Sequence, residues 1–276
     1  MLLSSSVGDS LARPIPTWLR ALFLINVVLL APQGIGFFSP ANIPFPVAVT
    51  PLNARFIGAL YLAAAVGMIL SALGADLADL RIFLFAFAFI SILVLIVTFV
   101  YWGEFTAKRI PLIWLATYIV DPIAATAALL TLRPLHPARP SRHRLSAIFL
   151  LTGLVFGGSG LVMLAAPALA STIWPWKITA LLAQVYGAFL FSFGGSAVLA
   201  AWEARPSAVR PFVASTVTLA VLTVVASLIH LDRFAPGIAS LVWFIVFAIA
   251  LVAFAGCLVV VLGSRGHRSV IARSAD

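Results

Sequence analysis

Two ionisable side chains fall inside strongly apolar segments of the sequence, where they could act electrostatically. Asp121 lies near the middle of one segment, directly before Pro122, and Arg55 lies about one helical turn into another, beside Asn53. An ionisable group at the centre of a membrane span costs about 2.5–3.5 kcal/mol on insertion scales, so each marks a candidate site. We expect Arg55 and Asp121 to form an ion pair. This pair would either have a structural role, holding two helices together, or a functional one. The functional role would be a gate, an anion site or a proton site.

Four polar side chains of another apolar segment fall on one helical face, at spacings of seven, four and three residues: Thr216, Thr223, Ser227 and His230. This spacing predicts a polar stripe that points into a helical bundle. His230 is followed by Asp232, and a histidine near a carboxylate can shuttle protons. The alternative is a histidine that only sits in a polar loop at the membrane interface.

Helix breakers occur near the end of the first apolar segment and at the matching place in the fifth. They are residues 31–34 (Ala-Pro-Gln-Gly) and residues 157–160 (Gly-Gly-Ser-Gly). Broken helices free backbone carbonyls, and at matching positions they are typical of transporter sites. Gln33 and Ser159 are therefore candidate pathway residues. In the alternative interpretation the glycines only allow close packing and Pro32 makes a harmless kink.

Other chemistry finds no support in the sequence. A haem held by two histidines is excluded, because the three histidines other than His230 lie outside the apolar segments. Metal-ligand spacing, a phosphate-binding glycine loop and a nucleophile with an evident base are also absent. Cys257 is the single cysteine, which excludes an intramolecular disulfide. We expect no enzymatic activity, no cofactor and no metal site.

The composition identifies the elements that must position these residues. Of 276 residues 63% are hydrophobic and 9% are charged, whereas soluble domains contain about 45–50% and about 25%. The chain is therefore expected to be an all-α, polytopic transmembrane bundle without a soluble domain. Eight apolar segments are long enough to span a bilayer: 18–38, 50–72, 82–101, 110–132, 145–166, 179–201, 211–230 and 238–262.

The basic residues are distributed unevenly between the two sides that these spans define. Twelve fall on the side of the N-terminus and five on the other, so the positive-inside rule predicts that both termini are cytoplasmic. Of the basic residues 15 are Arg and 2 are Lys, which is typical of a high-GC bacterium and places the protein in a plasma (inner) membrane. Three cytoplasmic segments are expected outside the spans: an N-terminal tail (1–17), a basic linker (133–144) and a basic C-terminal tail (264–276). We attribute the net charge of +9 to topology and to anionic lipid headgroups rather than to nucleic acid.

An internal repeat organises the chain, since an offset of 129 residues aligns the second quarter with the fourth. The most informative matches are Pro46 with Pro175, Gly58 with Gly187, Arg81 with Arg210 and Trp114 with Trp243. Each unit, 18–132 and 145–263, holds four spans, which predicts two tandem parallel four-helix repeats. Gln184 replaces Arg55 in the second unit and is a further pathway candidate.

Small residues recur one turn apart at the start of the second span of each repeat. These pairs are Ala54 with Gly58 and Ala183 with Gly187. Small residues at this spacing let helices approach closely in a membrane. We therefore assign all four residues to helix packing and expect these two spans to form the centre of the bundle.

Aromatic residues gather at the predicted outer junctions of the spans: Phe37, Phe38, Phe45, Trp102, Trp174 and Trp176, with Trp114 and Trp243 about one turn deeper. We expect an interfacial belt, and the alternative is a platform for a carbohydrate or a quinone. The third span, 82–101, has almost no polar group and many Phe residues, so it is expected to face lipid.

Two function classes remain for such a chain. The duplication and the matched breakers favour a small-solute transporter or permease-like protein, whose pathway would be lined by Arg55, Asp121 and the polar stripe. The scarcity of charge within the spans favours a non-transporting scaffold, sensor or accessory subunit. A membrane enzyme is a distant third. The sequence specifies no substrate, coupling ion, oligomeric state or protein partner.

Overall fold

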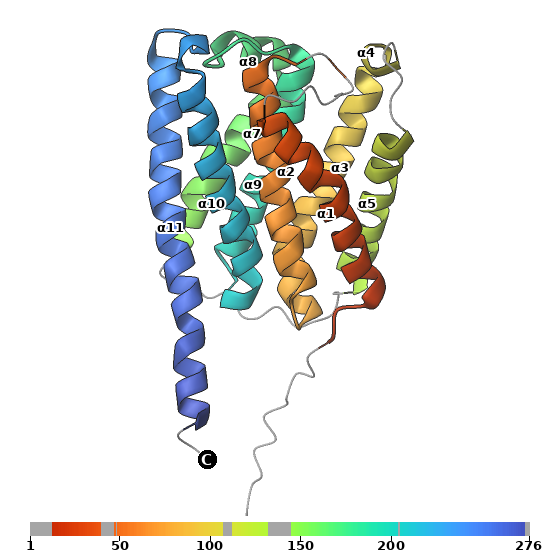
Figure 1. Ribbon diagram of the computed structural model, residues 1–276, viewed down its shortest axis with the longest axis vertical. Helices are drawn as coiled ribbons and strands as arrows, with labels where there is room; N and C mark the ends of the chain where they lie inside the picture. The colour runs from red at the N-terminus through yellow and green to blue at the C-terminus, as the bar shows by residue number, and fades with distance from the viewer. Residues whose placement is uncertain are drawn as a thin grey trace, which may run out of the picture.

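The chain folds into a single bundle of long, roughly parallel and antiparallel helices (Figure 1). The computed structural model describes residues 13–39, 47, 49–106, 112–131, 145–203 and 205–273. These residues form helices and turns without a β-strand. Eight helical segments in them are long and apolar enough to cross a membrane, which makes the protein an integral, multi-pass membrane protein.

The first half contributes four spans and one short helix: α1 (Thr17–Phe38), α2 (Pro51–Ala72), α3 (Arg81–Val100), the short α4 (Trp102–Thr106) and α5 (Leu112–Thr131). A 3-10 turn, Leu77–Leu80, precedes α3. The second half begins with a span built from α6 (Ser146–Thr152), a π-helical turn (Gly153–Gly157) and α7 (Gly158–Ala165). It continues with the short α8 (Pro167–Ile173), α9 (Ala180–Ala200), α10 (Pro206–Ile229), a 3-10 turn (Leu231–Arg233) and α11 (Ile238–Arg273).

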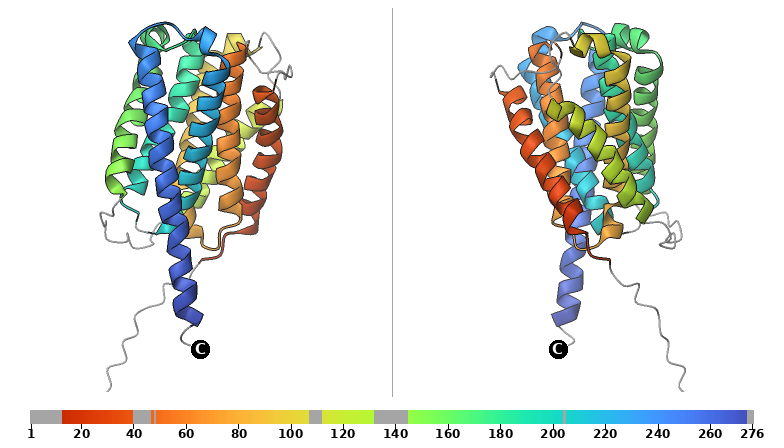
Figure 2. Two further views of the ribbon diagram at one scale, coloured as in Figure 1. Left: turned by 60° about the vertical axis from the view of Figure 1, so that its left-hand side comes forward. Right: turned by 90° about the vertical axis from the view of Figure 1, so that its right-hand side faces the viewer.

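Two helix boundaries differ from the sequence-based expectation. The helix α10 begins at Pro206 rather than at 211, because proline is well tolerated in the first helical turn. The helix α11 continues to Arg273, through most of the segment expected to be a tail. In Figures 1 and 2, α11 projects beyond the bundle at the end where α1 begins. We call this the lower end of the bundle, and the end that bears α4 and α8 the upper end.

The second and sixth spans, α2 and α9, form the centre of the bundle, as the small-residue spacing predicts. In their most apolar stretches 61% and 78% of the residues are buried, against 28% in α1 and in α11. The helix α2 packs against α1 and α10, whereas α9 packs against α7 and α3. Helices α3 and α10 in turn contact α5 and α11.

Glycines lie where the central helices contact their neighbours most closely. A Cβ atom at Gly58 would lie 2.8 Å from the carbonyl oxygen of Gly34 on α1. In the second half, a Cβ atom at Gly160 would lie 2.8 Å from the carbonyl oxygen of Gly187 on α9. Ala183, one turn before Gly187, is fully buried. Close backbone contact of this kind is a main source of helix association in membranes.

The third span faces lipid on part of its surface only, where Ile96 and Phe99 are exposed, so the expectation of a lipid-facing helix is wrong for the rest of the span. In its most apolar stretch 56% of the residues are buried, because α3 packs against α5 on one side and α9 on the other. Phe83 and Phe87 are buried in the core. Lipid tails and protein cores are equally apolar, so a run of apolar residues does not distinguish a lipid-facing helix from a buried one.

An ion cluster joins the two halves at the lower end. The guanidinium of Arg205 lies 3.1 Å from Asp79 and 2.9 Å from Glu203, and it also donates to the carbonyl oxygen of Ala78 at 3.0 Å. Partial burial raises the pKa of the Glu203 carboxyl, but the hydrogen bonds and charge of Arg205 outweigh it and lower this pKa below its usual value.

Candidate functional site

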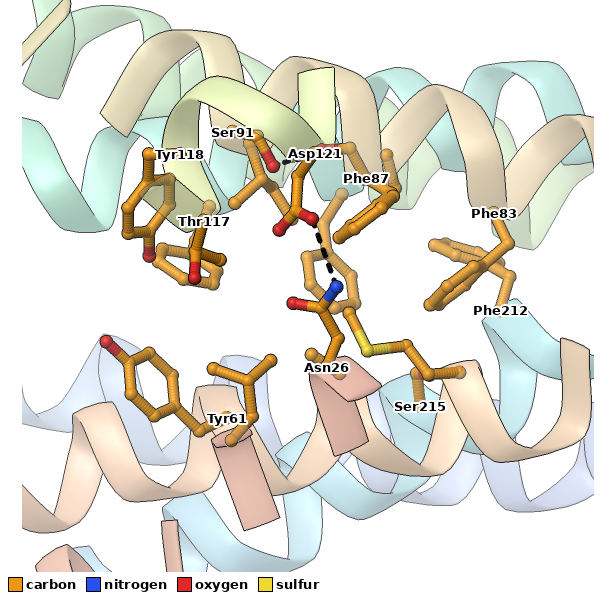
Figure 3. A pocket seen from close by; sticks show the side chains of 17 residues that line it. Asn26, Tyr61, Phe83, Phe87, Ser91, Thr117, Tyr118, Asp121, Phe212 and Ser215 are labelled. Carbon is orange, nitrogen blue, oxygen red and sulfur yellow. Dashed lines mark hydrogen bonds between the residues drawn. The ribbon is translucent and has the colours of Figure 1, made fainter. Parts of the chain in front are cut away.

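A cavity of about 60 Å³ lies inside the bundle, between α1, α2, α3 and α5, with α9 and α10 closing it (Figure 3). Since a buried water needs roughly 10–15 Å³ of such volume, the cavity has room for several waters or a small solute. Most of its lining is apolar and aromatic. The polar lining residues are Asn26, Tyr61, Ser91, Thr117, Tyr118, Asp121 and Ser215.

The carboxylate of Asp121 lies at this cavity and is 3% exposed. Its Oδ1 atom accepts a hydrogen bond of 3.0 Å from Nδ2 of Asn26 on α1, as Figure 3 shows. The same Nδ2 donates to the carbonyl oxygen of Leu22 at 3.1 Å. The next residue, Pro122, lacks an N–H group, so the carbonyl oxygen of Tyr118 has no intrahelical donor there. The site thus combines a buried acid with a locally weakened helix.

Two further polar atoms at the cavity have no hydrogen-bond partner. They are Oδ1 of Asn26 and Oγ of Ser215, and both are buried. The hydroxyl groups of Tyr61 and Tyr118 point toward each other across the cavity (Figure 3). A buried polar atom without a partner costs about 1–3 kcal/mol. Water or a ligand in the cavity would remove this cost, so the arrangement is suited to binding a polar group.

The expected ion pair between Arg55 and Asp121 is wrong. The Nε atom of Arg55 donates to the carbonyl oxygen of Phe38 at 3.2 Å, and Nη1 donates to Nε2 of His230. Phe38 ends α1, where the last carbonyls lack intrahelical donors and attract a cation. Arg55 is therefore held at the upper end of the bundle, and Asp121 has Asn26 as its partner instead.

His230 completes this contact at the upper end. Burial and the positive charge of Arg55 lower the pKa of the His230 imidazole below its usual value, while Asp232 opposes this shift. The neutral imidazole accepts the hydrogen bond from Arg55. Asp232 instead forms a salt bridge of 2.9 Å with Arg233. The contact at the upper end is thus a hydrogen bond from the cationic Arg55 to the neutral His230 imidazole.

The other predicted pathway residues do not line the cavity. Gln33 donates from Nε2 to the carbonyl oxygen of Leu29, and Gln184 from Nε2 to that of Leu164, both at 2.8 Å. Ser159 is exposed on the outer surface of α7. The structure thus separates Gln33, Ser159 and Gln184 from Asp121.

The first breaker does not interrupt its helix, so the expectation of a broken span is wrong there. The helix α1 continues through Pro32 to Phe38. In the second half the span contains a π-helical turn at 153–157, which ends at the first residue of the predicted breaker. A Cβ atom at Gly194 of α9 would lie 2.3 Å from the backbone nitrogen of Gly157. These glycines therefore serve close packing.

The polar stripe of α10 points into the bundle, as its spacing predicts. Thr216, Thr223 and Ser227 are 5%, 1% and 1% exposed. Ser227 Oγ accepts a hydrogen bond of 3.0 Å from Nε1 of Trp243. Of the polar residues of α10, however, it is Ser215 that reaches the cavity.

A buried cluster around Asn53 joins α2 to the second half, and sequence reasoning missed it. The Oδ1 atom of Asn53 accepts hydrogen bonds from Nε1 of Trp176 at 2.7 Å and from the hydroxyl of Tyr186 at 3.0 Å. Its Nδ2 atom donates to Oγ1 of Thr50 at 2.9 Å and to the carbonyl oxygen of Lys177 at 3.2 Å. All polar atoms of this amide are paired, which is the pattern of a structural joint.

Two tryptophans of the second half are buried rather than interfacial, so the expected aromatic belt is wrong for them, whereas Trp174 is only partly buried. Trp176 and Trp243 are 4% and 8% exposed, and their ring centroids lie 4.7 Å apart at an angle of 90°. Both rings pack against Phe56. Trp102, by contrast, is 41% exposed. Phe45, Lys108, Arg109 and the basic linker 133–144 lie outside the described residues.

No group of three or more metal-ligating side chains occurs in the part of the chain that the structure describes. Comparison of the chain with family models, with curated proteins and with solved structures found no match. The fold and the cavity therefore define the protein as a multi-pass membrane protein with an internal, mostly apolar pocket that holds a buried carboxylate.

Proposed function

We propose that the protein is a small-solute transporter of the permease type, and that its solute binds in the cavity beside Asp121. The observation that carries this proposal is the combination of a buried carboxylate with two unpartnered oxygens at one cavity. Ionisable groups within membrane bundles typically mark solute or ion pathways. If Asp121 had only a structural role, we would expect the polar atoms around it to have hydrogen-bond partners, as the polar atoms of the Asn53 cluster do.

We further propose that the bundle consists of two tandem parallel repeats. Matched local features support this proposal. The side chain of Thr50 accepts a hydrogen bond from Asn53 N at the start of α2, and that of Thr179 accepts one from Leu182 N at the start of α9. The helix α2 packs against α10 of the other half, and its counterpart α9 packs against α3, the counterpart of α10. A pseudo-two-fold axis between α2 and α9 relates these contacts, as in transporters with parallel repeats.

For the orientation, we propose that the lower end faces the cytoplasm of a cell with a plasma (inner) membrane. The excess of basic residues on that side supports this. Arg20 donates to the carbonyl oxygens of Ala72 and Gly74, at the end of α2. Some of the basic residues therefore also stabilise helix ends. The remainder would contact anionic headgroups, and we assign no nucleic acid partner and no catalytic role.

The competing function is a scaffold, sensor or accessory subunit. The paired Asn53 cluster and the buried tryptophans favour it, because they bind the two halves firmly together. A transporter, however, needs a cavity that binds solute and a path to both sides.

The two functions are distinguished by uptake into proteoliposomes. Radiolabelled choline, glucose and glutamate sample cationic, neutral and anionic solutes, with protein-free liposomes as the background. We expect uptake of at least one solute above background, and loss of that uptake in Asp121→Asn. Glu104→Gln removes a carboxylate from an exposed residue of α4 and is the matched control, which should transport normally. Background uptake of all three would favour the scaffold.

A further inference from the structure

We infer that the solute of this cavity is a small organic cation, namely an alkylammonium ion. The inference rests on the proposed role of the cavity as a solute site and adds the chemical class of the solute. Three properties of the lining carry it: its charge, its aromatic rings and its unpartnered oxygens.

The charge of the lining is that of one carboxylate. Asp121 is its acidic residue, and no Lys, Arg or His occurs among the described residues that line the cavity. The salt bridges in the described part of the chain involve Asp79, Glu203 and Asp232 rather than Asp121. Arg55 is engaged at the upper end by Phe38. A buried carboxylate without a cationic partner is unfavourable, so the ligand that suits it best carries the missing positive charge.

Aromatic rings make up much of the remaining wall. Besides the two tyrosines, five phenylalanines line the cavity: Phe83, Phe87, Phe189, Phe193 and Phe212. They come from α3, α9 and α10, so rings surround the cavity from several sides. Aromatic faces attract ammonium groups, and cages of such rings recognise alkylated ammonium ions. An anionic solute would meet the carboxylate and the negative ring faces, and both would repel it.

The oxygens distinguish an ammonium ion from a metal ion. Asp121, Asn26 Oδ1 and Ser215 Oγ provide a few hydrogen-bond acceptors in a cavity whose lining is mostly apolar and aromatic. Metal ions such as Ca²⁺ take about six to eight oxygen ligands from carboxylates, carbonyls and waters, whereas this lining offers one carboxylate and one side-chain amide, and its other polar groups are hydroxyls. An alkylammonium ion needs few acceptors for its N–H groups and places its carbon atoms against the phenyl rings. The mixed lining therefore fits an ammonium head with short alkyl groups.

Binding to the purified full-length protein in detergent tests this inference by isothermal titration calorimetry. The probes are methylammonium, tetramethylammonium and choline. The control ligand is 3,3-dimethylbutan-1-ol, which has the shape of choline without its charge. We expect at least one of the three cations to bind, and choline to bind more tightly than its neutral isostere. Because Asp121→Asn removes the negative charge that faces the bound cation, it should weaken the binding of each cation by about 10- to 100-fold.

Two further variants separate the charge from the shape of the site. Phe87→Leu keeps an apolar side chain beside Asp121 and should weaken binding by about two- to fivefold through loss of a cation–π contact. Glu104→Gln should bind like the wild type. Equal affinity for choline and its isostere, unchanged cation affinity in Asp121→Asn, or no binding of any of the three cations would each overturn the inference.

Failure of this inference is distinguishable from failure of the proposed transport function. Cation binding that depends on Asp121, together with background uptake of choline, would keep the ligand class and reject transport. Uptake of glucose or glutamate that depends on Asp121, without cation binding, would keep transport and reject the ligand class.

Discussion

Two buried asparagines, Asn53 and Asn26, form contrasting environments in the same bundle. Each is 2% exposed, and each makes hydrogen bonds between helices. Asn53 has both its oxygen and its nitrogen paired, with partners on the two halves. Asn26 donates to Asp121 but leaves its oxygen unpartnered at a cavity. Asn53 therefore belongs to a structural joint, a fully hydrogen-bonded cluster that stabilises the fold. Asn26 belongs to a site that still has an acceptor free to bind a ligand.

The largest expected loss of stability comes from a substitution in the Asn53 cluster. Asn53→Leu removes the acceptor of Trp176 Nε1 and of the Tyr186 hydroxyl, and both donors stay buried. Since each orphaned donor costs about 1–3 kcal/mol, the variant should lose about 2–5 kcal/mol of stability. Thermal unfolding in detergent measures this loss. An unfolding temperature equal to that of the wild type would show that the cluster is not a joint.

A smaller loss is expected from the close contact between α7 and α9. In Gly160→Ala the new Cβ atom would lie 2.3 Å from the backbone nitrogen of Phe191, so α7 must move away and the variant should lose about 1–3 kcal/mol. Gly158→Ala is the matched control, because nothing lies within 4 Å of its added Cβ atom. Thermal unfolding of the two variants side by side checks the prediction. Equal stabilities would contradict the close contact.

The site should respond differently from the joint. Asp121→Asn keeps an oxygen that can accept from Asn26 and removes a buried charge, so its stability should change by less than about 1 kcal/mol. Solute binding, by contrast, should be lost. The same unfolding measurement, with and without 10 mM choline or another solute that the wild type binds, separates the two effects. A loss of stability as large as that of Asn53→Leu would identify Asp121 as part of a joint.

The smallest effect concerns the contact between Arg55 and His230. The pKa of His230 is lowered in the folded protein, so the unfolded chain takes up a proton first as the pH falls. Stability is therefore fully present above the usual histidine pKa of about 6.5 and declines as the pH falls below it, toward the lowered value. His230→Gln should flatten this part of the profile, measured by thermal unfolding between pH 7.5 and pH 5.5. Identical slopes in the two proteins would contradict the contact.

The spans and the polar stripe of α10 were predictable, because both follow from local periodicity. Runs of about 20 apolar residues define the spans, and the spacing of Thr216, Thr223 and Ser227 defines an inward face. The partner of Asp121 was not predictable in this way, since it depends on which helices are neighbours in space. A polar residue within the first apolar segment, Asn26, was nevertheless a signal that could have been used.

The packing of α3 and the burial of Trp176 and Trp243, by contrast, could not be predicted from the sequence. Phenylalanine and tryptophan are favourable both at the lipid boundary and in a protein core. Their sequence positions therefore did not indicate that they fill the space between the two halves. The same ambiguity concealed the aromatic wall around Asp121, to which α3 contributes Phe83 and Phe87.

The central claim, that the cavity beside Asp121 is a solute site rather than a dry core, is tested most directly by thiol accessibility. In a Cys257→Ala background, single substitutions Ser91→Cys and Ala64→Cys place thiols at the cavity. Ser159→Cys lies on the outer surface of α7 and Asp232→Cys in an exposed loop. With a membrane-impermeant maleimide we expect labelling at 91, 64 and 232 and none at 159. Labelling at 232 alone would contradict the account.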